Sequence, residues 1–173
     1  IKTNFSIEDS KIGDSFSING VCLTITNIKN DLCSFDVVSE SLKKTNLSFL
    51  EEGDFVNIER AAKFNSRING HLVQGHIESM SKILSIETDD NEIRFKISID
   101  KDLLKYCIYK GSICIDGISL TIAEISDIIE LAIIPYTFNN TNLKYKKVDN
   151  MVNIETDMIS KYVNSIVKEM DIK

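Results

Sequence analysis

The sequence has no long apolar segment. Its longest apolar stretch, residues 125–134, is interrupted by Asp127 and Glu130, and it is much shorter than the roughly 20 residues that cross a membrane as a helix. Polar and charged residues such as Lys2, Asn4 and Glu8 break up the first residues, where a signal peptide would need an apolar run. We therefore expect no signal peptide, no membrane partner and a cytoplasmic protein.

The sequence also has no surplus of positive charge and no pair of metal ligands. Its formal net charge of −6 argues against a nucleic-acid partner, because surfaces that bind phosphates need clustered Lys and Arg. The four cysteines form no Cys-x-x-Cys pair and there are only two histidines, so we expect free thiols and no metal site. Hydrophobic residues make up 43% and charged residues 27% of the chain, which suits an enzyme and a binding module equally well.

What the sequence does contain is an internal repeat. Residues 19–28, 45–47 and 56–59 recur in the same order as residues 116–125, 141–143 and 152–155. In the first pair of segments five of ten positions are identical, and Asn19/Asp116 and Cys22/Ser119 preserve size or shape. Two copies are too few for a solenoid, so the repeat predicts two similar domains.

Each copy has the pattern of an antiparallel β-hairpin. Asn19-Gly20 and Asp116-Gly117 are two-residue turn signals, because both central residues of such a turn need a positive φ. Apolar and polar residues alternate over residues 21–26 and 118–123, as in strands with one buried face. Short strands with turn signals favour two small antiparallel barrels.

The repeat also predicts that the first barrel lacks its beginning. The second copy begins near residues 70–78, about 40 residues before Asp116, whereas eighteen residues precede Asn19. About 25 residues that would open the first barrel are therefore expected to be absent from the sequence.

Two segments have helical periodicity. Residues 100–110 place Leu103, Leu104, Cys107 and Ile108 on one face of a predicted helix. A second helix is expected at the end of the chain, where six residues form an apolar stripe: Ile159, Tyr162, Val163, Ile166, Val167 and Met170. The stripe fits two arrangements equally well, one in which it packs on the chain's own barrels and one in which it contacts another subunit.

Matched polar residues lie along the predicted strands. Cys22 and Thr24 share one strand face, and Ser119 and Thr121 repeat the arrangement in the second copy. Such residues can simply face solvent. Because both copies keep a small thiol or hydroxyl followed by Thr, the row could instead bind the edge of a planar heterocycle.

Other polar residues have local explanations. His71 and His76 are five residues apart, so on a strand they would point to opposite faces and could not chelate a metal together. Asp116 suits a tight turn, Lys110 would complement the dipole at a helix end, and Asp157 could cap the terminal helix.

Six segments together resemble riboflavin synthase, and they span essentially the whole chain. They are residues 19–24, 56–64, 70–76, 110–121, 134–137 and 152–155. The resemblance implies a mainly β fold of two tandem, similar, six-stranded antiparallel barrels followed by a C-terminal α-helix. The domains would be residues 1–68, 69–157 and 158–173, with the last one holding a homotrimer together.

The resemblance also implies an activity. The family converts two molecules of 6,7-dimethyl-8-ribityllumazine into riboflavin and 5-amino-6-ribitylaminouracil by moving a four-carbon unit, with no metal or other cofactor. Each barrel would bind one lumazine, and the reacting pair would meet where the barrels of neighbouring subunits face each other. Lumazine synthase would be a further partner.

Matching positions give the expected site. The polar residues nearest the chemistry would be Ser15, Cys22, His76, Asp116 and Asp157. Substrate would be bound by Cys22, Leu23, Thr24, Asp36, Val37, Val38, Ser39, Glu40, Ser41, Gly75, His76, Ile77, Lys110, Ser119, Leu120, Thr121, Ile134, Pro135, Tyr136, Thr137, Phe138 and Asn139. Two positions depart from the family: Gln74 stands where a small residue is expected and could narrow the second site, and Ser41 replaces a Thr but keeps the hydroxyl.

The expected chemistry is proton transfer between two stacked substrates. The 7-methyl group of the lumazine is acidic, and His76 could act as its base, while Ser15, Cys22 or a water could add to the other ring. The main alternative is a lumazine- or flavin-binding protein on the same fold without catalysis. A flavin-dependent reductase barrel is a weaker one.

Overall fold

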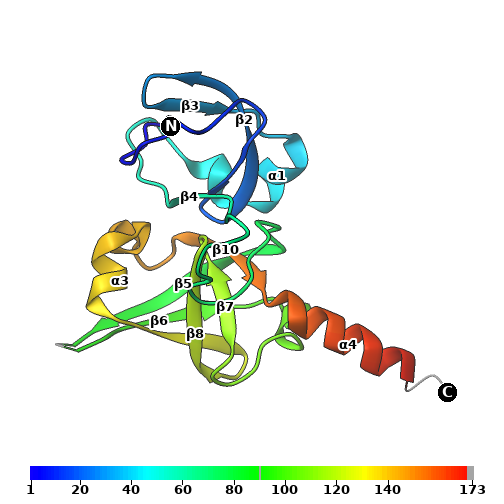
Figure 1. Ribbon diagram of the computed structural model, residues 1–173. Coiled ribbons are helices and arrows are strands. Elements are labelled where there is room, and N and C mark those ends of the chain that lie inside the picture. Colours follow the sequence, from blue (N-terminus) through cyan, green and yellow to red (C-terminus); the bar gives the residue numbers. More distant parts are fainter. Residues whose placement is uncertain (90, 171–173) are drawn as a thin grey trace.

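The computed structural model describes residues 1–89 and 91–170 as two β units with a helix at the end (Figure 1). The N-terminal unit lies above the C-terminal unit in this view, and the last helix extends away from the lower unit. No helix in the described ranges is long and apolar enough to cross a membrane.

The N-terminal unit is an open, four-stranded antiparallel sheet in the order β3-β2-β1-β4. Its elements are β1 (Ser15–Ile18), β2 (Val21–Lys29), β3 (Leu32–Phe35), α1 (Ser39–Lys44), the 3₁₀ helix η1 (Asn46–Phe49) and β4 (Ile58–Arg60).

The C-terminal unit is a closed, six-stranded barrel in the order β10-β5-β6-β9-β8-β7. Its elements are β5 (Ser79–Thr88), β6 (Ile93–Ser98), α2 (Lys101–Leu104), β7 (Ser112–Ile115), β8 (Ile118–Ile125), β9 (Ile128–Ile133), α3 (Pro135–Asn140), the 3₁₀ helix η2 (Asn142–Tyr145) and β10 (Met151–Thr156). The helix α4 (Met158–Met170) follows.

The repeat explains why one unit closes and the other does not. In both sequence and sheet order, β1, β2, β3 and β4 match β7, β8, β9 and β10. In the barrel, β5 and β6 fill the gap between β10 and β9, and the described residues contain no counterpart of these two strands as full elements. The mainly β fold, one closed six-stranded barrel and the terminal helix are thus confirmed. The first unit has four strands in an open sheet instead of the six of a complete barrel.

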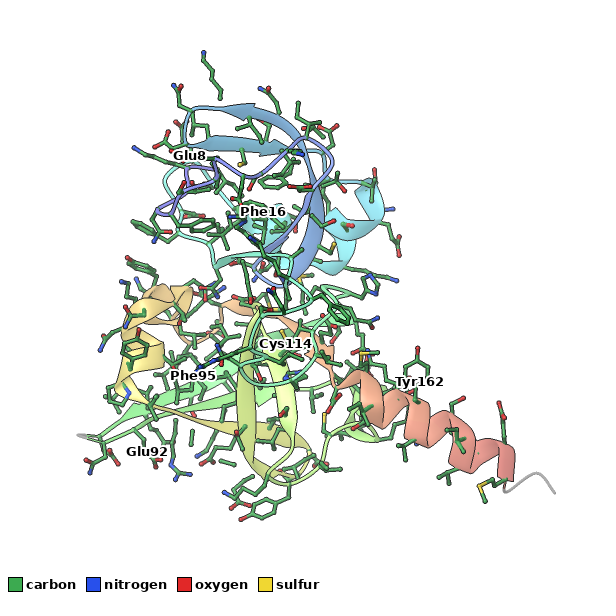
Figure 2. All side chains as sticks on the ribbon, in the orientation of Figure 1. Glu8, Phe16, Glu92, Phe95, Cys114 and Tyr162 are labelled. Carbon is green, nitrogen blue, oxygen red and sulfur yellow. The ribbon has the colours of Figure 1, made fainter. Side chains whose placement is uncertain are left out.

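Each unit has its own hydrophobic core. The alternation predicted for β2 is confirmed, because Val21, Leu23 and Ile25 are buried while Cys22 and Thr24 are exposed. In β8 the alternation holds only from Leu120 to Ile122, because Ile118 and Ser119 are both half-buried and Ala123, at a register shift between Ile122 and Glu124, is buried. Figure 2 shows Phe16 and Phe95 inside the two separate units.

The predicted two-residue turns are confirmed, and they meet between the units. Asn19 and Gly20 have φ values of 47° and 81°, and Asp116 and Gly117 have 48° and 84°. A Cβ on Gly20 would lie 2.7 Å from the backbone nitrogen of Gly117, and a Cβ on Gly117 would lie 2.9 Å from that of Gly20. Glycine is therefore required both for the turn and for the contact between the units.

The two helix predictions fare differently. The helix expected over residues 100–110 is wrong beyond its first turn, because α2 ends at Leu104. Lys110 has a φ of 61° and its N–H donates to Ile122 O on β8 (3.0 Å), so the chain has already turned toward β7 and Lys110 does not end a helix. Asp157 does cap α4, since its Oδ1 accepts the Ile159 N–H (2.9 Å).

The apolar stripe of α4 is uncovered. Its six residues are between 49% and 70% exposed, and Tyr162 points away from the barrel in Figure 2. The helix is tied to the barrel by an ion pair between Lys161 and Glu78 (3.0 Å). Of the two arrangements left open by the sequence, packing on the chain's own barrels is not the one adopted.

Candidate functional site

The candidate site begins on the outer face of β1 and β2. Ser15 lies opposite Thr24 and Ser17 opposite Cys22 in the strand register, so these four short polar side chains share one face. Ser15 and Ser17 are half-buried, and Cys22 and Thr24 are exposed. The face can therefore offer a row of hydroxyls and one thiol to a ligand.

The second unit repeats this face with one exchange. Ser112 lies opposite Thr121 and Cys114 opposite Ser119, so the thiol has moved from β2 to the strand equivalent to β1. Cys114 is fully buried, and burial raises the pKa of its thiol to about 12, which keeps it neutral. Only the first unit presents an accessible thiol on this face.

A segment between the units runs past both faces. At one point Cys22 N donates to Gly75 O (2.9 Å), and Gly75 lies so close that a Cβ there would be 2.6 Å from the Cys22 Cβ. Further back along the segment, His71 Nδ1 lies 2.7 Å from Ser119 Oγ. Residues 71 and 76 belong to no strand, so the opposite-face argument made for the two histidines does not apply.

A buried carboxylate holds this segment in place. Glu155 on β10 is 1% exposed. Its Oε1 accepts the N–H of Gln74 (2.7 Å), and its Oε2 accepts those of Gly75 (2.9 Å) and His76 (3.0 Å). The backbone that carries His76 is thus fixed by the second barrel while it contacts β2 of the first unit. Sequence analysis missed Glu155 as a site residue, although its segment was one of the repeated ones.

His71 is the second residue that sequence analysis left without a role in the site. Burial lowers the pKa of its imidazole, which favours the neutral ring. A neutral ring can accept the hydrogen bond that the Ser119 hydroxyl can donate, or donate one to it.

The predicted site residues fall into distinct places. Ser15, Cys22 and Thr24 share the outer face of β1 and β2, and Gly75 contacts Cys22. His76 directly follows Gly75 and is exposed. Leu23 and Leu120 point into the hydrophobic cores, and Thr121 is exposed on β8. Asp157 caps α4, and Asp116 is completely buried between the units.

The remaining predicted residues lie at the two matched short helices and in one turn. Asp36, Val37 and Val38 precede α1, which begins with Ser39, Glu40 and Ser41, and Ile134 precedes the matching α3. Within that second segment Phe138 packs against Phe95 of the core (6.3 Å between ring centroids), whereas Pro135, Tyr136 and Asn139 are exposed and Thr137 is half-buried. Ile77 packs against the first unit's core, and Lys110 is exposed in its turn.

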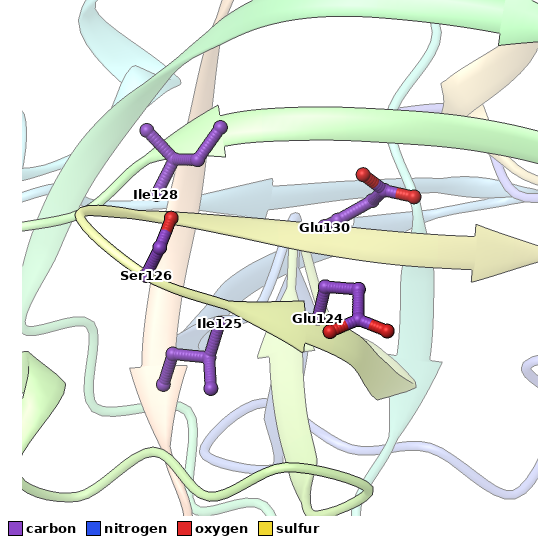
Figure 3. Close-up of a pocket in the computed structure, with 5 residues that line it drawn as sticks. All are labelled: Glu124, Ile125, Ser126, Ile128 and Glu130. Atoms are coloured by element: carbon purple, nitrogen blue, oxygen red, sulfur yellow. The ribbon is translucent and has the colours of Figure 1, made fainter.

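Two cavities differ in whether predicted site residues line them. A cavity of about 1770 Å³ lies along the segment between the units, and its lining includes Ser15, Cys22, His71, Gly75 and Ser119. The pocket in Figure 3, beside Glu124 and Glu130, has a volume of only about 170 Å³ and contains no predicted site residue. The smaller pocket is below the roughly 300–1,000 Å³ that is usual for ligand pockets. Of the two, the larger cavity is the candidate site because predicted site residues line it, although His76 is not among them.

Comparison with known proteins gives the same family as the sequence. A model of the lumazine binding domain matches residues 1–61 and 74–157. Riboflavin synthase of Actinobacillus pleuropneumoniae is 41% identical over 162 residues, which are 93% of this chain and 75% of that protein. Riboflavin synthase of Escherichia coli strain K12 is 45% identical over 154 residues, 87% of this chain and 72% of that protein.

Solved structures agree with the fold. LumP in complex with riboflavin superposes with a TM-score of 0.79 at 30% identity, covering 87% of this chain and 82% of that one. LumP in complex with 6,7-dimethyl-8-(1'-D-ribityl) lumazine has a TM-score of 0.77 at 29% identity, with coverages of 87% and 81%. The match of the domain model to both units, together with relatives of this identity and coverage, shows that the chain belongs to the riboflavin synthase family of lumazine-binding proteins.

Proposed function

We propose that the protein is a riboflavin synthase, which converts two molecules of 6,7-dimethyl-8-ribityllumazine into riboflavin and 5-amino-6-ribitylaminouracil. The observation that carries the proposal is the duplicated polar face, Ser15–Ser17–Cys22–Thr24 on one unit and Ser112–Cys114–Ser119–Thr121 on the other. A reaction between two copies of one molecule is served by two copies of one binding face. The two products together contain all the atoms of two substrates, so the reaction balances without an external oxidant.

The residues around β2 suit the proton transfers of this reaction. His76 is exposed and directly follows Gly75, whose backbone contacts Cys22 of the thiol-bearing face. Its imidazole can take a proton from the acidic 7-methyl group of one lumazine. Ser15, Cys22 or a water can add to the ring of the other lumazine and leave again when the four-carbon unit moves. Holding both rings in reactive orientation contributes much of the rate, since proximity can supply several kcal/mol. We place the enzyme in the cytoplasm, where its free thiols stay reduced.

The activity test uses the lumazine alone. We expect purified protein to convert dimethylribityllumazine to riboflavin, in a ratio of one riboflavin per two lumazines, followed by absorbance and by chromatography of both products. Tight binding without turnover would contradict the enzyme and support the alternative function of a ligand-binding protein, in line with the LumP complexes.

We also propose that α4 holds a homotrimer and that each active pair of lumazines lies between subunits, with the faces of residues 1–68 and 69–157 supplied by different chains. The uncovered stripe of α4 supports this, because a row of six exposed apolar residues is an unfavourable surface for an isolated chain. A homotrimer would bury the stripe against two copies of itself. Lumazine synthase, which we propose as a further partner, would then meet the trimer rather than a single chain.

The trimer predicts a specific effect of charge in the stripe. Ile166→Glu is expected to convert the trimer to monomer, because it places a carboxylate in an apolar contact, whereas Ser165→Glu on the neighbouring exposed position of α4 should leave the trimer intact. Light scattering after size-exclusion chromatography measures both masses. A trimer that survives Ile166→Glu would show that the stripe is not the interface.

A further inference from the structure

The two units are joined by a buried ring of six polar side chains, which we call the interdomain ring. It consists of three pairs that occupy matching positions in the repeat: Asn19 and Asp116, Asn46 and Asn142, and Asn57 and Asn153. All except Asn57 are at least 95% buried. The ring therefore forms part of the contact that sets the position of one unit relative to the other.

Hydrogen bonds in the ring come in matched pairs that cross between the units. Asn46 N donates to Asn153 Oδ1, and Asn142 N donates to Asn57 Oδ1, both at 2.7 Å. Likewise Asn57 Nδ2 donates to Asp116 O, and Asn153 Nδ2 donates to Asn19 O, both at 2.8 Å. The ring thus has approximate twofold symmetry.

One pair breaks this symmetry, because Asn19 of the first unit is matched by Asp116 of the second. Asp116 Oδ1 accepts from Asn153 N (2.7 Å) and Asn46 Nδ2 (2.8 Å). Its Oδ2 accepts from Asn142 Nδ2 (2.8 Å) and lies 2.9 Å from Lys146 Nζ. All four contacts come from donors, so the group acts as an ionised carboxylate with its acceptor sites filled.

The cation of this pair also has a matched position in the first unit. Lys146 lies four residues after Asn142, and the residue four positions after Asn46 is Leu50, so Lys146 corresponds to Leu50. The second unit therefore has a charged residue at both of these positions, Asp116 and Lys146, and the first unit has an uncharged residue at both, Asn19 and Leu50. A buried carboxylate is strongly unfavourable without a partner, which explains why Asp116 and Lys146 occur together.

We propose that Asp116 and Lys146 form a positioning pair for the synthase reaction, and that Asp116 does not contact the substrate. Asp116 leads directly through Gly117 into β8, so the pair fixes the strand that carries Ser119 and Thr121. The adjoining contact between Gly20 and Gly117 couples the position of β8 to that of β2, which carries Cys22. This inference rests on the proposed function, because it assigns the pair to the reaction of that same site.

The experiment is a cycle of Asp116→Asn, Lys146→Leu and the double variant, which reproduces the Asn19–Leu50 combination of the first unit. Each single variant leaves one buried charge without its partner and is expected to lose about tenfold or more in kcat and to unfold at lower urea concentration. The double variant is expected to recover to within about twofold of the original kcat and to unfold later than either single variant. Lys147→Leu, at the neighbouring exposed position, should change neither quantity.

The outcomes separate positioning from direct chemistry. If the Asp116 carboxylate took part in the reaction, removing Lys146 could not restore the activity lost in Asp116→Asn. A double variant as inactive as Asp116→Asn would therefore overturn the proposal. A double variant less stable than both single variants would overturn it too. If the unaltered protein showed no turnover, the proposed function would fail, while the urea cycle would still decide whether the two residues act as a pair.

Discussion

Glu155→Gln is expected to lower the rate of riboflavin formation about 100-fold, because small displacements of catalytic groups have effects of this size. The Glu155 carboxylate accepts three backbone N–H groups, those of Gln74, Gly75 and His76. A glutamine offers only one carbonyl oxygen, and its amide NH₂ would face further donors. Since each charge-assisted hydrogen bond contributes roughly 1.5–3 kcal/mol, the segment should move away from β2 and take His76 with it.

The repeat supplies a matched control for this variant. Glu59 occupies the position equivalent to Glu155 and lines the larger cavity, but it is exposed, and its side chain makes no hydrogen bond or ion pair within residues 1–89 and 91–170. Glu59→Gln should therefore retain activity within about twofold. Kinetics are measured well below the unfolding temperature, with circular dichroism to confirm that both variants are folded. Equal losses in the two variants would show that the three hydrogen bonds do not position the site.

The parts of the fold that follow from local rules were predicted correctly. The turns at Asn19-Gly20 and Asp116-Gly117 depend on residues that tolerate positive φ, and the cap at Asp157 depends on one side chain and a nearby N–H. The alternation along β2 likewise follows from the two-residue period of a strand. Each of these features is decided within a few residues, so each is visible in the sequence.

Predictions failed where distant segments decide the structure. The apolar spacing of residues 100–110 suits a helix, but α2 ends at Leu104 and the chain then turns so that Lys110 pairs with Ile122 on β8. The position of Gly75 against Cys22 is a contact between residues far apart in the chain. No local sequence pattern predicts such a contact, and none predicts the hydrogen bonds that Glu155 accepts.

The interdomain ring contains residues whose matched positions in the repeat could have been recognised from the sequence. Its six residues lie in or next to repeated segments, so their matched positions were visible in the sequence. The sequence does not show that matched residues meet across an approximate twofold axis. With that geometry known, the one unmatched pair, Asn19 and Asp116, becomes the informative position.

The largest loss of stability is expected from Gly20→Ala. The new Cβ would lie 2.7 Å from Gly117 N and 3.2 Å from Gly117 Cα, and the φ of 81° is itself unfavourable for alanine. Because backbone atoms of both turns are involved, relief requires the two units to separate and so weakens the interdomain ring. Strained backbone and overpacking together suggest about 3–5 kcal/mol. The chain contains no tryptophan, so urea unfolding is best followed by far-ultraviolet circular dichroism.

Gly53→Ala separates the two causes of that loss. Gly53 also has a positive φ, 101°, but a Cβ there would meet no atom within 4 Å. Its substitution should therefore destabilise the protein by only about 1–2 kcal/mol, the value of the backbone strain alone. The difference between the two variants measures the contact between the turns. If Gly20→Ala were no more destabilising than Gly53→Ala, the turns would not touch in solution, and the coupling of β2 to β8 through Gly20 and Gly117 would be lost with them.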